Sequence, residues 1–496
     1  MYWANFLHFY QPAKQQSDIL EAVVVQSYRP ILEGIDKNPN VKLTLNINGA
    51  LIELFNRYKY HDLIDLLRKL AKEGKIEFTS SSKYHAFLPL VEEKEIIRQI
   101  KANDETNRFF LGDAYQPKGF FPPEMGWKKE LAPMIESLGF EWVILDEIAC
   151  GGHINNVDYG KISKIKGTNL SVYFRERRLS NLIMSAVVRS RETLLDAMRK
   201  DLNSGRFLVT AMDGETFGHH RPGLEKLLFE VFDTPEFELV KISDLPRFFH
   251  ETVEVEAVES TWASSVEDIK RNVQFLSWSD PENIIHAIQW KFLHLVMDEF
   301  YKMDQNNSSY KDVRQKMDIA LSSDPFWWAS AKPWWSLEMI EEGAYRLLET
   351  LRAIPNVSKE ILDQASKYYE EIVSMAFNWQ RSGKIRQMAA ESNEILRIPF
   401  KDRTLGTPGK ENVYHAFLDM MKGLEKKAAE NGEYEKAILW RDAIYKLDKK
   451  LDIYDTVNAI DLLRVEIPNE DVEKTIIEYE EKYKEIRGGQ PEQRGA

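Results

Sequence analysis

The sequence predicts an α/β fold, a parallel barrel followed by helices, and three observations support this prediction. Over the first 245 residues, short apolar runs alternate with longer helical patterns, which is typical of a parallel sheet. Seven or eight such runs are enough for a closed or nearly closed barrel. From about residue 262 the pattern is helical, and a polar stretch with proline and glycine, 399–412, precedes the last helices.

The predicted strands share a run of apolar residues bounded by polar or turn-forming residues. They are 2–9, 42–47, 75–80, 118–122, 141–146, 170–175, 206–213 and 238–243. Catalytic groups of such barrels lie at the carboxyl ends of the strands. Polar residues follow that rule here, because the following residues end or shortly follow a predicted strand: His8, His85, Glu124, Asp146, Arg175 and Asp213.

The chain is long for one compact unit, so we expect several segments. They are a barrel over 1–255, a helical bundle over 256–398, a C-terminal helical module over 413–486 and a tail over 487–496.

Within the C-terminal module, residues 424–451 resemble the UVR motif, a helical hairpin, although an ordinary pair of charged helices fits as well. A hairpin of this size is too small to bury a core alone. We therefore expect self-association or protein association through 413–486.

The composition limits the classes of partner. A net charge of −13 argues against nucleic acid, whose binding needs clustered lysine and arginine. Cys150 is the single cysteine, which suits a reducing compartment. The N-terminus has no basic stretch followed by an apolar one, and no run of 18 apolar residues occurs, so we expect a cytoplasmic protein without a membrane partner.

Two acids stand out in their local surroundings. Glu124 lies in GFFPPEMGW, 119–127, among aromatic residues and behind two prolines. A buried carboxylate is costly unless it is paired or used, and the alternative is a loop residue that points to solvent. Asp213 ends the predicted strand 206–213, where a helix N-cap is the alternative. We expect the two carboxyl groups at neighbouring strand ends of one barrel, which is the arrangement that glycoside hydrolysis needs.

Five short blocks in chain order resemble the family 57 glycoside hydrolases. They are HFYQP (8–12), GKIEFTSSSKYHAFLPL (74–90), GFFPPEMGW, MDGETFGHH (212–220) and ESTWASS (259–265). The resemblance implies an incomplete barrel of seven strands and helices, followed by a helical bundle at the same site. It also implies a retaining enzyme acting on α-linked glucans, with Glu124 as nucleophile and Asp213 as general acid/base.

Two positions depart from the family pattern. Tyr10 stands where the first block usually has a second histidine, and Phe121 stands where tryptophan is frequent. Neither residue is one of the two acids, so the chemistry can survive while the substrate contacts differ. Hydrolase, 4-α-glucanotransferase and branching-type activity therefore all remain open.

The candidates for substrate contact are polar or aromatic residues of these blocks and of the tryptophan-rich segment 323–345, where flat side chains can stack on a sugar ring. They are His8, Gln11, His85, Phe121, Trp127, Arg175, Glu215, His220, Trp262 and Trp334. His8 and His85 are interpreted as neutral donors to sugar hydroxyls, and Arg175 as the partner of a carboxylate. The tryptophans could instead fill the junction of bundle and barrel.

No metal or other cofactor is expected. Metal-dependent polysaccharide deacetylases carry a His-x-Asp or an His-x-x-x-His arrangement, and this chain has neither, with Tyr10 standing where the aspartate would be. Two other functions remain as alternatives: such a deacetylase-like hydrolase, and a catalytically altered carbohydrate-binding or regulatory protein on the same barrel. The presence of both Glu124 and Asp213 argues against the second.

Overall fold

The computed structural model describes residues 1–202, 204–332, 334–392 and 411–449, with scattered positions between 462 and 481. Nearly all of the predicted linker 399–412 and the whole of the predicted tail 487–496 lie outside the described residues. The chain divides into two compact units. The first unit comprises Met1–Met184, Met198–Gly214 and Thr234–Ser392, and the second comprises Ser185–Ala197, Glu215–Asp233 and the C-terminal helices.

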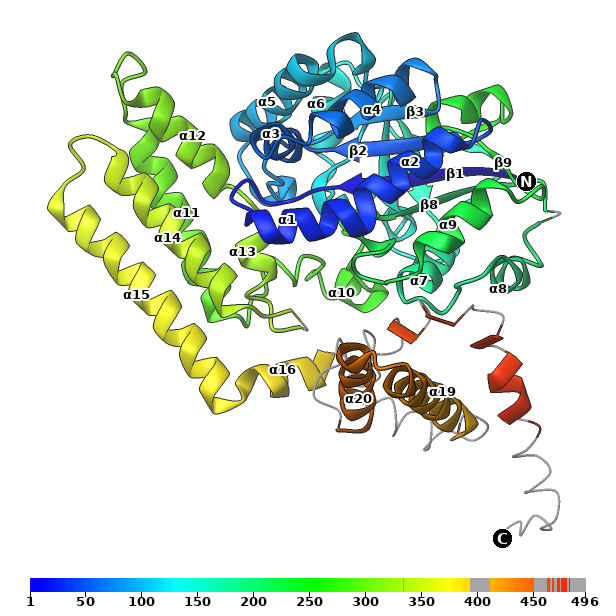
Figure 1. Cartoon of the computed structure of the whole chain (residues 1–496). Helices are drawn as coiled ribbons and strands as arrows, with labels where there is room; N and C mark the ends of the chain where they lie inside the picture. The colour runs from blue at the N-terminus through cyan, green and yellow to red at the C-terminus, as the bar shows by residue number, and fades with distance from the viewer. Residues whose placement is uncertain are drawn as a thin grey trace, which may run out of the picture. The chain divides into compact units, whose positions relative to one another are not determined.

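A single mixed sheet forms the centre of the first unit (Figure 1). The strands in the described residues are β1 Tyr2–Phe9, β2 Leu43–Ile47, β3 Ile76–Ser80, β4 Gly119–Phe120, β5 Trp142–Asp146, β6 Ile162–Ile165, β7 Ser171–Arg175, β8 Phe207–Asp213, β9 Glu238–Leu239 and β10 Thr252–Val255. Their order is β10-β6-β7-β5-β4-β3-β2-β1-β8, with β9 also paired to β1. From β7 to β8 every neighbouring pair is parallel.

The parallel run nearly closes on itself, because its two end strands, β7 and β8, are joined by hydrogen bonds. The backbone amide of Glu176, just after β7, donates to the Val209 carbonyl at 2.8 Å. The Arg175 guanidinium Nε donates to the Ala211 carbonyl at 2.8 Å. Seven parallel strands that almost close confirm the predicted incomplete barrel.

The register aligns the ends of five strands in one row. His8 of β1 lies between Asn46 of β2 and Asp213 of β8. On the other side of Asn46, Thr79 of β3 is its partner, and Gly119 of β4 is the partner of Thr79. This row collects four of the five sequence blocks at one end of the barrel. Because both faces of a barrel strand are covered, β2 is buried along its whole length.

The helices of the described residues surround the strands and then form a bundle (Figure 1). Around the barrel they are α1 Ser17–Val23, α2 Arg29–Lys37, α3 Gly49–Arg57, α4 His61–Lys72, α5 Glu93–Leu111, α6 Leu131–Ser137 and α7 Arg177–Met184. Later in the first unit come α10 Val266–Lys270, α11 Ile284–Tyr301, α12 Tyr310–Ala320, α13 Asp324–Trp327, α14 Leu337–Ala353, α15 Lys359–Ser382 and α16 Lys384–Ser392. The second unit holds α8 Arg191–Ala197, α9 Glu225–Phe232, α19 Glu411–Glu430 and α20 Tyr434–Lys449.

The bundle is joined to the barrel by a common hydrophobic core and by buried ion pairs. Side chains such as Phe292 of α11 and Leu348 of α14 belong to the same buried cluster as Phe120 of β4. Arg314 of α12 donates to both carboxylate oxygens of Glu95 of α5, at 2.9 and 2.7 Å, and both side chains are buried. A shared core of this kind holds the helical segment against the barrel.

Three elements differ from the sequence-based prediction. The predicted strand 238–243 is only β9, and the chain turns at Ile242–Arg247 in a short helix instead. The short strands β6 and β10 were not predicted, and they extend the sheet beyond β7. Apolar runs this short do not distinguish a strand from a buried turn, which explains all three differences.

The C-terminal helices α19 and α20 form a hairpin with its own core. Trp440 and Leu447 are fully buried, whereas Tyr434, Ile438 and Tyr445 of α20 keep about half or more of their surface exposed. The helical module is confirmed, and the UVR resemblance stays a prediction. Ser185–Ala197 and Glu215–Asp233, which precede and follow β8 closely in the chain, group with this hairpin. No helix in the described part of the chain is long and apolar enough to cross a membrane.

The ion pair between α5 and α12 generates a stability prediction. Arg314→Met leaves the carboxylate of Glu95 buried without its partner, so we expect it to lower the free energy of unfolding by about 3–5 kcal/mol. Lys316→Met is the matched control on the same helix, because its partner Glu349 is solvent-exposed and such a pair contributes at most about 1 kcal/mol. Urea unfolding of the two variants measures both values, and equal losses would contradict the role given to Arg314.

Candidate active site

Glu124 is held in a strained turn directly after β4. Pro122 and Pro123 follow the strand, and the backbone at Glu124 and Met125 is left-handed, with φ of 62° and 50°. Such a conformation costs a non-glycine residue on the order of 1–3 kcal/mol and persists only where the surroundings impose it. Backbone hydrogen bonds hold the turn here: the Met125 amide donates to the Pro122 carbonyl at 2.8 Å, and the Gly126 amide donates to the Pro123 carbonyl at 2.9 Å.

The fifth sequence block supplies the direct partner of the Glu124 carboxylate. The Trp262 indole Nε1 donates to Glu124 Oε2 at 2.7 Å, and the Trp262 backbone amide donates to the Glu124 carbonyl at 3.2 Å. Trp127 and Ser260 exchange backbone hydrogen bonds at 2.9 and 3.3 Å, which joins the two blocks. The Glu124 side chain keeps 16% of its surface accessible, so a small molecule can reach it.

Asp213 ends β8, and the glycine that follows it allows close packing. A Cβ at Gly214 would lie 2.2 Å from the ring of Phe9, so only glycine fits between β8 and that ring. The expectation of neighbouring strand ends was wrong for Glu124 and Asp213, because β3, β2 and β1 lie between β4 and β8. The curl of the sheet brings the two acids close enough that the charge of Asp213 raises the pKa of Glu124.

Both acids have raised pKa values. Burial, together with the charges of Asp213 and Asp324, raises the pKa of Glu124 to about 8, and the hydrogen bond from Trp262 opposes this rise. Burial raises the pKa of Asp213 to about 6, and the positive charge of Arg175 opposes it. Near neutral pH the two carboxyl groups therefore hold about one proton between them.

A chain of hydrogen bonds fixes the tautomers of two histidines beside Glu124. Burial holds both imidazoles neutral, lowering the pKa of His8 well below its ordinary value and that of His85 to about 3. His8 Nδ1 donates to the Asn46 amide oxygen at 2.8 Å, so its Nε2 accepts from His85 Nε2 at 3.2 Å. His85 Nδ1 then accepts from the Ser323 hydroxyl at 3.1 Å. All four ring nitrogens thus have protein partners.

Tyr10 and Asp324 complete this cluster. The Tyr10 ring stacks on His85 with ring centroids 4.2 Å apart, and its hydroxyl donates to Asp324 Oδ2 at 2.6 Å. Asp324 begins α13, and His85 Nδ1 lies 3.9 Å from one oxygen of Asp324 and 3.9 Å from one oxygen of Glu124. The departure from the family pattern at Tyr10 therefore has a structural reason, since it binds a third carboxyl group at the site.

The role of Asp324 was missed in the sequence. Burial raises the pKa of its carboxyl group, against hydrogen bonds from the hydroxyls of Tyr10 and Ser322. Asp324 lies in the segment singled out for its tryptophans, where the Asp-Pro start of a short helix was an available signal. Nothing in the sequence connects that aspartate with His85 or Tyr10, which are more than 230 residues earlier.

Arg175 is buried and fully engaged with protein groups. Its guanidinium donates to Asp146 and to the Asn181 side chain, at 2.8 and 2.7 Å, in addition to the Ala211 carbonyl. It lies close enough to Asp213 for its charge to lower the pKa of that residue. Arg175 therefore acts on the site through its charge.

The other predicted contact residues differ in their location. Phe121 packs in the site against the His8 ring with centroids 4.7 Å apart, whereas the Trp127 side chain is fully buried. Trp334 stacks on Trp327, which ends α13, with centroids 4.3 Å apart. Gln11 donates to the hydroxyl of the buried Tyr28 at 3.4 Å.

Glu215 and His220 belong to the second unit, where the His220 amide donates to the Glu215 carbonyl at 2.7 Å. Within the described ranges, no group of three or more His, Cys, Asp or Glu side chains is arranged to hold a metal ion.

Comparison with known proteins gives a consistent result. The model of the family described as glycosyl hydrolase family 57 matches residues 6–258, which confirms the resemblance seen in the five blocks. An α-amylase of Pyrococcus horikoshii is 28% identical over 232 residues, which make up 46% of this chain and 36% of that protein. The match thus takes in about a third of that relative's length.

Solved structures share the fold. The 4-α-glucanotransferase of Thermococcus litoralis superimposes with a TM-score of 0.56 at 21% identity, covering 71% of this chain and 58% of that one. A branching enzyme of the same family from Pyrococcus horikoshii gives a TM-score of 0.56 at 15% identity, covering 74% of this chain and 94% of that one. At these identities the likeness is one of fold.

The raised pKa of Glu124 generates a prediction about stability. Between its ordinary pKa of 4.5 and about 8, the folded chain retains a proton that the unfolded chain releases, so stability is lost as the pH rises. Glu124→Gln removes this loss. We expect the variant to match the wild type near pH 4.5 and to exceed it at pH 8, by on the order of 1–3 kcal/mol.

Thermal or urea unfolding at several pH values measures this difference. Glu141→Gln is the control, because the Glu141 side chain is 60% exposed. A Glu124→Gln gain that does not change with pH would contradict the assignment.

Proposed function

The chain belongs to glycosyl hydrolase family 57, and we propose that it cleaves α-linked glucans with retention of anomeric configuration. One observation carries this proposal. Two carboxyl groups share about one proton at the end of the barrel where catalytic groups collect, and one of them accepts a hydrogen bond from an indole. A retaining glycosidase needs one carboxylate and one carboxylic acid at the same time, which is the number of protons that this pair holds.

In the proposed mechanism, Glu124 is the nucleophile. Its carboxylate attacks the anomeric carbon, the bond to the leaving oxygen breaks, and a covalent glycosyl-enzyme forms. With pKa values of about 8 for Glu124 and about 6 for Asp213, the proton lies mainly on Glu124 in the free protein, so the reactive form is the minor one in which Asp213 carries it. The Trp262 N–H favours this arrangement, because a donor at 2.7 Å stabilises the ionised form of Glu124. Substrate that separates the two acids from water strengthens that hydrogen bond further.

Asp213 is the proposed general acid and base. It protonates the leaving oxygen in the first step and then takes a proton from water or from an acceptor hydroxyl in the second. The raised pKa of Asp213, about 6, keeps a substantial fraction protonated in weakly acidic solution. Arg175 limits the rise and so keeps Asp213 able to release its proton again.

The acceptor in the second step decides between hydrolysis and transfer. The relatives named above are an α-amylase, a 4-α-glucanotransferase and a branching enzyme, so their names leave both outcomes open for this chain. Partly exposed tryptophans, Trp327 and Trp334, offer flat faces near Asp324 for a sugar ring. The individual substrate contacts, from His8 and Gln11 to Trp334, are part of the proposal.

The competing function is that of a carbohydrate-binding protein on the same barrel. A binder has no use for a strained carboxylate beside a second acid, and the strain at Glu124 therefore favours the enzyme. A cytoplasmic location and an association through α19 and α20 remain predictions. The exposed Tyr434, Ile438 and Tyr445 of α20 support an association.

The nucleophile is tested by chemical rescue. Glu124→Ala should abolish turnover of maltooligosaccharides, because no covalent intermediate can form. On an α-glucosyl fluoride, whose fluoride leaves without protonation, azide should enter the vacated space and yield the β-glucosyl azide. The products are identified by chromatography and NMR. Retention of most activity by Glu124→Ala, without azide, would show that another group is the nucleophile.

The acceptor is tested by incubating the wild-type protein with maltooligosaccharides and separating the products by chromatography. Products longer than the substrate indicate transfer, and glucose and maltose alone indicate hydrolysis. If the protein binds these oligosaccharides and neither product class appears, the carbohydrate-binding alternative gains support and the proposed activity is wrong for this substrate class.

A further inference from the structure

Asp146 is a buried carboxylate outside the pair of proposed catalytic acids. It ends β5 and is 1% exposed, and its two oxygens accept hydrogen bonds from two arginines, Arg175 and Arg177. Arg175 Nη1 donates to Oδ2 at 2.8 Å, and Arg177 Nε donates to Oδ1 at 2.8 Å. The Ile148 backbone amide also donates to Oδ1, at 3.1 Å. Charge-assisted hydrogen bonds in a buried site hold both guanidinium groups firmly.

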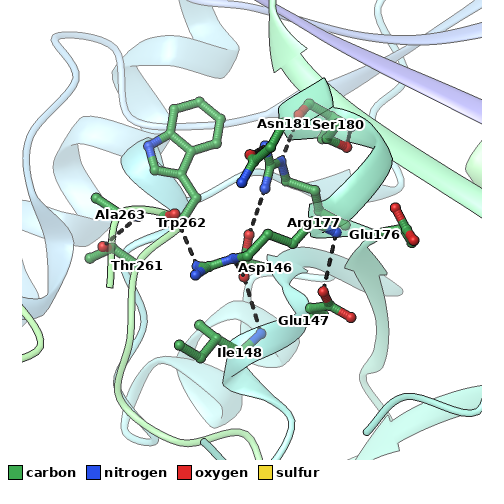
Figure 2. A network of polar contacts seen from close by, with 12 residues as sticks. Asp146, Glu147, Ile148, Glu176, Arg177, Ser180, Asn181, Thr261, Trp262 and Ala263 are labelled. Carbon is green, nitrogen blue, oxygen red and sulfur yellow. Dashed lines mark hydrogen bonds and ion pairs between the residues drawn. The ribbon is translucent and has the colours of Figure 1, made fainter. Parts of the chain in front are cut away.

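The two arginines reach in different directions from this shared carboxylate. Arg175 extends to the Ala211 carbonyl of β8, the strand that ends at Asp213. Arg177 begins α7, and its remaining nitrogens donate to two backbone carbonyls, those of Ser264 at 2.7 Å and Trp262 at 3.0 Å. Figure 2 shows Arg177 between Asp146 and the loop that carries Trp262.

The loop that Arg177 holds carries the hydrogen-bond donor of Glu124. It is compact, because the Thr261 amide donates to the Ser264 side chain at 2.8 Å. Fixing the carbonyls of Trp262 and Ser264 therefore fixes the backbone from which the indole extends. The indole Nε1 ends 2.7 Å from Glu124 Oε2.

We propose that Arg177 is a positioning residue for the nucleophile: anchored on Asp146, it holds Trp262 so that the indole N–H stays on the carboxylate of Glu124. The role of Glu124 as nucleophile rests on the proposed function, whereas the chain of contacts does not. The charges that shift the pKa of Glu124 are those of Asp213 and Asp324, so the influence of Arg177 on Glu124 passes through the geometry of the loop.

The consequence concerns the ionisation of Glu124. The charged groups near Glu124 are the acids Asp213 and Asp324, which raise its pKa. The titratable side chain of His85 is also near, with Nδ1 3.9 Å from Glu124 Oε1, but it is neutral. The hydrogen bond from Trp262 lowers its pKa. When that bond is lost, the pKa of Glu124 rises, and the acidic limb of the pH profile moves to higher pH.

The test compares three arginine variants. Arg177→Met removes all three contacts, and Arg177→Lys keeps a cation for Asp146 but cannot reach both carbonyls. Arg178→Met is the control, because Arg178 is the next residue of α7, is 43% exposed and pairs with Asp201 at 2.7 Å. For both Arg177 variants we expect the midpoint of the acidic limb of the kcat/KM profile to move about one pH unit higher. KM should change less than about twofold. Arg178→Met should keep the wild-type profile.

A double-mutant cycle separates positioning from a general loss of stability. Trp262→Phe removes the same hydrogen bond directly, so adding Arg177→Met should shift the limb no further. The proposal would be overturned if the double variant moved the midpoint of the acidic limb by the sum of the two single shifts. It would also be overturned if both Arg177 variants kept the midpoint of the wild type. Arg177→Lys guards against misfolding of the Met variant, because Asp146 stays paired.

A second readout does not need turnover. A water-soluble carbodiimide couples to protonated carboxyl groups, and peptide mass spectrometry follows the rate at Glu124 as a function of pH. The midpoint should rise in both Arg177 variants and not in Arg178→Met. If the wild type turns over no glucan and this shift still occurs, the proposed function fails while the positioning role stands. Unchanged midpoints would contradict the positioning role.

Discussion

Burying one carboxyl group beside another is the constraint on which this molecule depends. Burial makes each acid resist losing its proton, and the charge of Asp213 adds to this effect at Glu124, so the pair is unfavourable as two charges. One neighbouring group stabilises the ionised form of each acid: the Trp262 indole N–H donates to Glu124, and the charge of Arg175 acts on Asp213. The result is a pair of carboxyl groups that holds about one proton near neutral pH.

The strained turn at Glu124 and the neutral imidazole pair serve the same end. A left-handed glutamate is unfavourable, yet hydrogen bonds from the backbone and the indole of Trp262 keep it in place. His8 and His85 lie beside it without adding a charge, because the relay from Asn46 to Ser323 occupies both rings. A protonated imidazole there would lower the pKa of Glu124 and change the proton sharing.

The barrel and the two acids could be predicted from the sequence, because their signals are local. Strands such as 141–146 are short apolar runs with clear boundaries, and Glu124 and Asp213 lie in blocks of a known family. Asp324 and the Asp146–Arg177 link could not be predicted. Their roles depend on contacts between residues 31 to 314 positions apart, and a local sequence pattern does not predict such a contact. The strands β6 and β10 were not predicted because they are too short to give a clear pattern.

Trapping the covalent intermediate tests the central claim most directly. A 5-fluoro-α-glucosyl fluoride slows the second step more than the first, so the glycosyl-enzyme accumulates, and digestion with peptide mass spectrometry locates the sugar. We expect one glucosyl group on the peptide that contains Glu124, in the wild type and in Arg178→Met. A label on another carboxylate, or product formed without any labelled peptide, would contradict it.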